Sequence, residues 1–239
     1  MPGELTTVPF VLMYHSVGRT DADPYRIAVS PSRFEAQLDW VARHGRRGCS
    51  MRELLDALDG GSTTGLVGLT FDDGYADFTT RACPALRRHG FTATVFVVAG
   101  RLGGHNDWDR QGPRRPLMTA DQVRHAAGQG IEIGSHGLCH RRLSTAGADV
   151  LTEELERSRE ILEALVNRRV RGFCYPYGEL SDTCATAAEA SGYDYAVATW
   201  GMARRDRHAL PRTYVGERDR ASRLLAKQIR HRLTWGGSR

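Results

Sequence analysis

This chain lacks long hydrophobic runs and shows no cysteine framework. Its longest apolar stretches, near Val11–Tyr14 and Thr94–Ala99, are far shorter than the roughly 20 residues that span a bilayer. Its start has no basic segment followed by a long apolar stretch, so we expect no secretion signal. Five cysteines, an odd number with no CxxC pair, fit a reducing compartment better than a set of disulfides. These absences predict a cytoplasmic protein without a membrane span.

Lysine is also nearly absent. Lys227 is the only one, and arginine supplies the rest of a basic charge that leaves a formal net charge of +5. No run of arginines alternates with aromatic residues, so we expect no nucleic-acid partner. The arginines are densest over residues 204–223, where a patch would favour anionic ligands, although compositional drift explains the bias more simply. Within this patch we predict that Arg212 binds substrate, as a partner for a phosphate.

No repeat or low-complexity linker divides the 239 residues, which predicts one domain over residues 1–239. Short apolar segments alternate with amphipathic ones. The predicted strands lie near residues 10–14, 66–71, 92–98, 131–134, 170–175 and 193–198. The predicted helices begin after Ser30, Ser50, Ala76, Thr119, Asp149, Ser181 and Arg220, with a capping box at Ser50 and another cap at Thr119. This alternation favours a mainly parallel barrel or doubly wound sheet, whose chemistry lies at the carboxyl ends of the strands.

The first polar cluster, Thr70-Phe71-Asp72-Asp73-Gly74, directly follows the strand predicted over residues 66–71. Adjacent carboxylates repel each other, and burial adds a desolvation cost that raises their pKa unless a cation pairs with them. A divalent cation would take one carboxylate as a ligand and leave the other as a general base. The cluster alone is equally consistent with an acidic loop that caps the next helix.

The second cluster, Ser135-His136-Gly137-Leu138-Cys139-His140, follows the strand predicted over residues 131–134. Its two histidines can converge on one metal through a turn of chain, with N–Zn distances of about 2.0–2.1 Å. Neutral imidazole beside a carboxylate suits zinc, cobalt, nickel or iron. We expect Cys139 to face away as a buried structural thiol. An HxxxH pair is common by chance, so a solvated pair is the alternative.

The third cluster is the turn Tyr175-Pro176-Tyr177-Gly178, at the end of the strand predicted over residues 170–175. Such a turn presents backbone N–H groups that could stabilise an oxyanion, and aromatic faces on which a sugar could pack. Together, the three clusters supply two imidazoles and a carboxylate for a metal, a spare carboxylate and an oxyanion donor. These are the groups needed for metal-assisted hydrolysis of an amide or ester.

In combination, LTFDDGYADF, SHGLCH and FCYPYGELSD resemble three motifs of the polysaccharide deacetylase family, the NodB-homology carbohydrate esterases, in the family's order. The resemblance runs from about Val11 to Val215. Segments 13–17, 106–109 and 210–212 resemble the branch that deacetylates poly-N-acetylglucosamine. The resemblance implies an α/β fold, an irregular (β/α) barrel. It also implies one divalent metal ion, with zinc as the first choice and cobalt or nickel as alternatives.

The resemblance also implies roles for single residues. Asp73, His136 and His140 would bind the metal, Asp72 would act as the general base, and the backbone N–H of Tyr177 would bind the oxyanion. Water on the metal would lose a proton to the base and attack the acetamide carbonyl.

The sequence departs from the family's pattern at two points. Cys174 stands where many relatives carry an arginine that orients the base, and the late Leu-x-His that supplies an acid in relatives is not evident. We therefore predict His15 as the catalytic acid, because it follows the first predicted strand, with His208 and His231 as alternatives. The predicted sugar contacts are Tyr175, Pro176, Trp108 and Trp200.

From these residues and the resemblance we expect a metal-dependent N-deacetylase that releases acetate from an N-acetylated amino sugar. The missing export signal favours an intracellular substrate, such as a sugar nucleotide, a lipid-linked precursor or a glycosylated metabolite. Two other functions fit the same residues. One is hydrolysis of an O-acetyl ester or a non-sugar amide, and the other is carbohydrate binding by a barrel that has lost turnover. No feature of the sequence indicates an oligomeric state.

Overall fold

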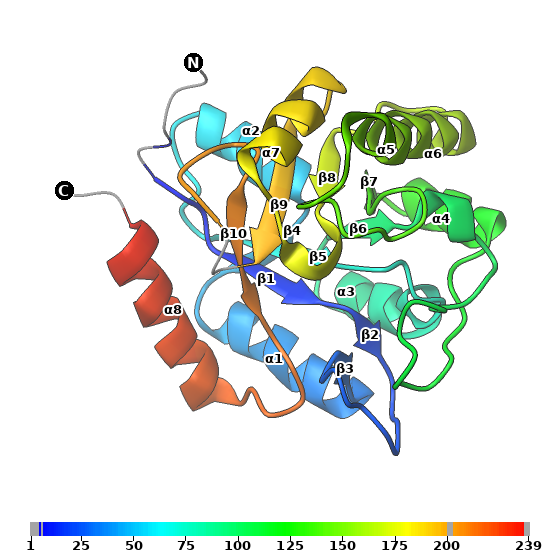
Figure 1. The fold of residues 1–239 in the computed structure, drawn as a ribbon. Helices are drawn as coiled ribbons and strands as arrows, with labels where there is room; N and C mark the ends of the chain where they lie inside the picture. Colours follow the sequence, from blue (N-terminus) through cyan, green and yellow to red (C-terminus); the bar gives the residue numbers. More distant parts are fainter. Residues whose placement is uncertain (1–4, 6, 200–202, 237–239) are drawn as a thin grey trace.

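Seven parallel strands form a closed ring at the centre of the protein (Figure 1). They are β1 (Val11–Tyr14), β5 (Leu66–Phe71), β6 (Thr94–Val97), β7 (Glu132–Ser135), β8 (Gly172–Cys174), β9 (Tyr195–Thr199) and β10 (Leu210–Tyr214). Strand β1 closes the ring because it pairs with β5 on one side and β10 on the other. The structure, a computed structural model, describes residue 5 and residues 7–199 and 203–236. The predicted irregular (β/α) barrel is confirmed.

Three shorter strands lie outside this ring. β4 (Arg47–Cys49) pairs with the start of β5, and β2 (Ser16–Val17) pairs with β3 (Ala28–Val29). None of these was predicted, and neither was β10. The β10 sequence, LPRTY, contains a proline and an arginine and has no continuous apolar run, so periodicity does not mark it as a buried strand.

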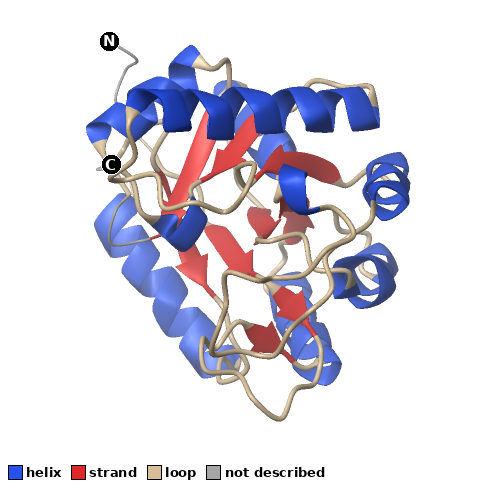
Figure 2. Ribbon diagram, turned by 45° about the vertical axis from the view of Figure 1, so that its right-hand side comes forward, coloured by secondary structure: helices blue, strands red, loops and turns tan. Residues whose placement is uncertain are grey.

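Helices cover the outside of the ring (Figure 2). They are α1 (Pro31–Arg43), α2 (Met51–Asp59), α3 (Cys83–Arg88), α4 (Ala120–Gly128), α5 (Ala148–Thr152), α6 (Ser158–Val166), α7 (Asp182–Ala190) and α8 (Ala221–Trp235). A π-helical turn, Phe78–Ala82, precedes α3, and a second, Glu153–Arg157, joins α5 to α6. The helix predicted from Asp149 is therefore continuous in space but contains a wide turn, and this turn contributes to the candidate site.

The predicted helix starts agree with the observed caps. The Ser30 side chain accepts a hydrogen bond from the backbone N–H of Arg33, and Thr119 forms a complete capping box with Gln122. The box predicted at Ser50 is only half formed, because the Glu53 side chain pairs with Arg47 and does not return to the cap.

Buried polar groups fill the amino end of the barrel. Glu132, at the start of β7, accepts hydrogen bonds from the Tyr195 hydroxyl at 2.9 Å and the Thr94 hydroxyl at 2.6 Å. It also accepts the backbone N–H of Arg52 at 2.8 Å. Burial raises the pKa of Glu132, while these donors act in the opposite direction. With this end filled, the carboxyl ends of the strands are the open side of the barrel.

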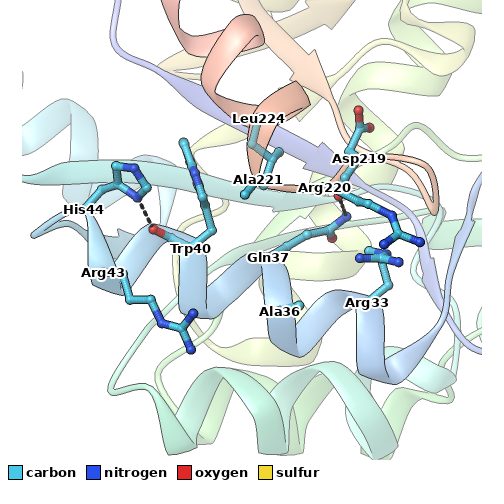
Figure 3. Close-up of a pocket in the computed structure, with 10 residues that line it drawn as sticks. All are labelled: Arg33, Ala36, Gln37, Trp40, Arg43, His44, Asp219, Arg220, Ala221 and Leu224. Carbon is cyan, nitrogen blue, oxygen red and sulfur yellow. Dashed lines mark hydrogen bonds between the residues drawn. The ribbon is translucent and has the colours of Figure 1, made fainter.

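Helix α8 packs beside α1 at the edge of the molecule (Figures 1 and 3). The Gln37 side-chain amide, buried between them, donates to the carbonyl oxygens of Gly216 at 3.1 Å and Asp219 at 2.9 Å. These bonds fix the segment that joins β10 to α8. Within the described ranges, no helix has both the length and the apolar character that a membrane crossing requires.

Candidate metal centre and active site

The loops that follow β5 and β7 bring together one aspartate and two histidines. Oδ1 of Asp73 lies 3.3 Å from Nε2 of His136 and 3.3 Å from Nε2 of His140. All three side chains are buried, and their ligand atoms lie within 4.8 Å of one another. Asp73 thus meets two histidines that lie 63 and 67 positions later in the sequence, at the carboxyl end of the barrel, where the chemistry was expected.

The spacing of these three atoms suits a small divalent cation. Zinc bonds of about 2.0–2.2 Å to nitrogen and oxygen in a tetrahedron place neighbouring ligand atoms about 3.3 Å apart. The Asp73–His136 and Asp73–His140 separations have this value. Two imidazole nitrogens and one carboxylate oxygen leave a fourth position for water or substrate, which is the ligand number of a catalytic zinc site. The residues present therefore fit the metal that the sequence predicts.

Neighbouring groups set the charge of Asp73 and the orientation of the His136 ring. Burial opposes ionisation of Asp73, but the adjacent imidazoles of His136 and His140 bring its pKa well below the usual value, so the carboxylate is charged. Nδ1 of His136 lies 2.7 Å from the carbonyl oxygen of Cys174, which assigns the proton to Nδ1 and leaves Nε2 free to bind a metal.

Two ligand residues and Tyr177 have left-handed backbone conformations. The φ angles are +70° at Asp73, +58° at His140 and +60° at Tyr177. The described chain contains five non-glycine residues with positive φ, and three of them lie here. Non-glycine residues in this region carry a conformational cost, which the surrounding contacts must offset, and such residues cluster at functional sites.

Asp72 is held by Arg212, from β10. Nη1 and Nη2 of the guanidinium donate to Oδ1 at 2.6 Å and to Oδ2 at 2.8 Å. Burial alone would raise the pKa of Asp72, but the charge and hydrogen bonds of Arg212 bring it below the usual value. The guanidinium also donates to the hydroxyl of Thr70 at 3.2 Å and to Sγ of Cys174 at 3.1 Å. Because Arg212 is 2 % exposed, the prediction that it binds a substrate phosphate is wrong.

The same geometry explains the departure at Cys174. In this chain the arginine that holds Asp72 comes from β10, and the thiol at position 174 accepts one of its hydrogen bonds. Asp72, His136 and Cys174 also offer atoms within 4.8 Å of one another. Burial raises the pKa of the Cys174 thiol, and Arg212 already neutralises Asp72, so this second group is a poor metal site.

His15 lies at the same mouth, just after β1. Its Nε2 is 3.9 Å from Oδ2 of Asp72, and its side chain is 17 % exposed. Its buried Nδ1 has no hydrogen-bond partner in the part of the chain that the structure describes. The position agrees with the predicted role as an acid. The two alternatives face elsewhere, because His208 is buried with Nε2 2.9 Å from the Tyr193 carbonyl and His231 packs against Phe10.

Aromatic side chains enclose His140. Trp108 stacks on the imidazole with a ring-centre separation of 4.3 Å and an interplanar angle of 17°, and Tyr177 meets it edge-on at 4.7 Å. Tyr177 is 42 % exposed, and the Arg142 guanidinium lies 4.4 Å over its ring. His140, a predicted metal ligand, therefore covers one face of the Trp108 ring, the side chain that was predicted to contact a sugar.

The structure disagrees with some predictions for this region, and one of them falls on a residue outside the described ranges. Tyr175 cannot stack on a sugar, because its ring is fully buried and its hydroxyl donates to the His208 carbonyl at 2.9 Å. Pro176 is buried as well. Cys139 is half-buried and not fully enclosed. Trp200 lies outside the described residues.

Glu154 was not predicted, yet it supports the loop between the two histidines. This 1 % exposed residue belongs to the π-helical turn Glu153–Arg157. Its Oε2 accepts the backbone N–H groups of Leu138 at 2.8 Å and Cys139 at 3.0 Å. Gly137 approaches so closely that a Cβ there would lie 2.8 Å from the same oxygen. In sequence, Glu154 is one of several acids on a helix, and no pattern distinguishes it.

Comparison with known proteins agrees with this geometry. The sequence profile of the family described as polysaccharide deacetylase matches residues 59–196. The chain is similar to YxkH of Bacillus subtilis, assigned to the polysaccharide deacetylases, with 30 % identity over 210 residues that cover 86 % of this chain and 70 % of YxkH. It is 22 % identical to a poly-β-1,6-N-acetyl-D-glucosamine N-deacetylase of Staphylococcus aureus, over 70 % of this chain and 60 % of that protein.

Solved structures show the same fold. The deacetylase PplD of Streptococcus pyogenes, solved with acetate, superposes with a TM-score of 0.77 at 26 % identity, over 95 % of this chain and 99 % of PplD. IcaB of Ammonifex degensii superposes with a TM-score of 0.76 at 24 % identity, over 92 % of this chain and 97 % of IcaB.

The buried Arg212–Asp72 pair yields a first prediction. Replacement of Arg212 by methionine would leave Asp72 buried and unpaired, which is expected to lower the free energy of unfolding by about 3–5 kcal/mol. The double variant Arg212→Met/Asp72→Asn should recover most of this loss, since no buried charge remains. Urea unfolding measures the free energy of unfolding of the two variants. If the single and double variants are equally stable, the loss does not come from an unpaired charge on Asp72.

A second prediction concerns Glu154. Glu154→Leu removes the acceptor of two backbone N–H groups and is expected to weaken metal binding about 10–100-fold, whereas Glu154→Gln keeps a carbonyl acceptor and should lose much less. Competition with a chromophoric chelator measures the affinity, and circular dichroism checks that both variants are folded. Equal metal affinities of folded Leu and Gln variants would contradict this role.

Proposed function

Because this chain belongs to the polysaccharide deacetylase family, we propose that it is a metal-dependent N-deacetylase that acts on an N-acetylated amino sugar. The observation that carries the proposal is the buried Asp73–His136–His140 group with Asp72 and His15 at the same mouth. The metal we propose is zinc, with cobalt or nickel as alternatives. When bound by the three ligands, it would polarise the carbonyl and lower the pKa of a bound water.

The remaining steps belong to side chains of this chain. Asp72 is ionised and fixed by Arg212, so its carboxylate can accept a proton from the attacking water. His15 would donate a proton to the amine nitrogen as the C–N bond breaks. The backbone N–H of Tyr177, set in a left-handed conformation after Pro176, would donate to the oxyanion. The products are acetate and a free amine.

The substrate class rests on the mouth of the barrel and on relatives. Tyr177 presents a partly exposed ring beside the ligands, and aromatic faces suit the apolar faces of sugars. One relative is an N-deacetylase of poly-N-acetylglucosamine, and the solved deacetylase PplD was crystallised with acetate. These names support an acetamido sugar as the substrate.

We further propose that the enzyme works in the cytoplasm on a sugar nucleotide, a lipid-linked precursor or a glycosylated metabolite. All five cysteines are free, and three of them are buried, which suits a reducing compartment. A substrate phosphate would need a partner other than Arg212.

The decisive assay is acetate release. The metal-loaded protein is expected to release acetate from N-acetylglucosamine conjugates and much less from O-acetylated xylose. Asp72→Asn should lower kcat by about 10²–10⁴-fold while metal content stays unchanged, because the base is lost and the ligands remain. Asp73→Ala is the matched control, expected to lose the metal as well. Metal-loaded wild type that releases no acetate would favour a binding protein, and preference for the ester would favour an esterase.

The role of His15 is tested with two leaving groups. An acetamide nitrogen must be protonated as it leaves, whereas a nitrophenolate departs without a proton. His15→Gln is therefore expected to lower acetate release from the amide by about 10²-fold or more but to change hydrolysis of p-nitrophenyl acetate little. Equal losses on both substrates would remove His15 as the acid.

A further inference from the structure

Helix α8 turns a stripe of large aliphatic side chains toward solvent. Leu225, Ile229 and Leu233 are 44 %, 49 % and 82 % exposed. Their spacing of four residues places them along one side of the helix. In the described chain, the only other large hydrophobic side chains with such exposure are Tyr25 and Tyr177. Single exposed leucines need no explanation, but a continuous stripe on one helix marks a binding surface.

The inner face of the same helix is more polar than this outer stripe. Leu224, Gln228 and His231 face the core, and each is 5 % exposed or less. An ordinary surface helix buries its apolar side and exposes its polar side. In α8 the three aliphatic side chains of the stripe are exposed to solvent, while the Gln228 amide and the His231 imidazole are buried. Packing within this chain therefore does not account for the stripe.

The charges on α8 have one sign. The helix sequence, ASRLLAKQIRHRLTW, contains four arginine or lysine residues and no acidic residue. Nζ of Lys227 donates a hydrogen bond to Oδ2 of Asp219 at 2.7 Å. By helical periodicity, Arg232 lies on one side of the aliphatic stripe, and Arg223 and Arg230 lie on the other. An apolar stripe between arginines on a helix without acids is typical of segments that bind an anionic membrane surface.

A groove of about 450 Å³ lies beside the stripe and is lined by apolar side chains, arginines and one aspartate, Asp219 (Figure 3). It lies between α1 and α8, with Ala36, Trp40 and Leu224 among its lining residues. Arg33 and Arg220 lie together at one end of it. The buried Nε of Arg33 has no hydrogen-bond partner among the residues that the structure describes.

The groove and the stripe are continuous. Ala221 lines the groove one helical turn before Leu225, so the groove opens next to the first residue of the stripe. At the other end of the groove, Arg43 reaches outward beside His44 (Figure 3). The surface as a whole thus combines exposed aliphatic groups with guanidinium groups around them.

We propose that this surface of α8 and α1 docks the protein on an anionic phospholipid bilayer. The aliphatic stripe would enter the boundary between headgroups and acyl chains, and the arginines would contact lipid phosphates. A second copy of the chain is a poorer occupant. Two α8 helices packed through this stripe would bring like charges together with no acidic residue on either helix to pair with them. The inference does not depend on the proposed catalytic function.

Vesicle sedimentation tests the proposal with the whole protein. Wild type is expected to bind vesicles of phosphatidylcholine mixed with phosphatidylglycerol, to bind vesicles of phosphatidylcholine alone much less, and to dissociate as salt is raised. The variant Leu225→Ser/Ile229→Ser/Leu233→Ser changes only exposed side chains and should bind the mixed vesicles at least about tenfold more weakly. Its melting temperature provides the check on folding.

A pair of charge variants separates a local surface from net charge. Arg223→Gln/Arg232→Gln should weaken binding to the mixed vesicles about tenfold or more. Arg124→Gln/Arg157→Gln removes the same charge from the opposite side of the barrel (Figure 1) and should bind as wild type does. Equal loss in both pairs, equal binding to neutral vesicles, or no binding would overturn the proposal. So would a wild-type dimer that the triple serine variant converts to monomer.

Discussion

The structure at the open end of the barrel depends on the separation of two adjacent buried carboxylates. Asp72 and Asp73 follow β5 and are both almost inaccessible to solvent. Two such charges cannot share one buried space without cations. The chain resolves this by directing them to different partners at the turn after β5, where the backbone of Asp73 is left-handed with a φ angle of +70°. Asp72 meets the guanidinium of Arg212, and Asp73 meets two imidazoles.

This separation assigns different chemistry to the two groups. A carboxylate that accepts two strong hydrogen bonds from a guanidinium is fixed in place and ionised, which suits a base. A carboxylate with one oxygen 3.3 Å from the nitrogen of each of two imidazoles suits a metal ligand. At the opposite end of the barrel, Glu132 pairs with neutral hydroxyls, and burial raises its pKa. The two ends of the barrel therefore differ in their partners, since Asp72 meets a guanidinium whereas Glu132 accepts hydrogen bonds from uncharged donors.

How much of this the sequence predicts depends on how local each interaction is. The strand over residues 66–71 and the ligands Asp73, His136 and His140 lie in short motifs with apolar flanks, so pattern and resemblance identified them. Arg212 was misassigned because its partner is 140 residues away and strand β10 has no apolar run. Tyr175 was predicted to contact a sugar, but the sequence does not show which of Tyr175 and Tyr177 faces inward.

The strained backbone at the candidate site depends on contacts from other parts of the chain. Left-handed conformations at Asp73 and His140 persist only where surrounding contacts over-determine them. Those contacts are present: Glu154 holds the loop between the histidines through two backbone N–H groups, and Trp108 stacks on the His140 imidazole. Since Nδ1 of His140 has no hydrogen-bond partner within the described ranges, packing and loop geometry orient this ring. Contacts within the chain thus hold the residues predicted to bind the metal.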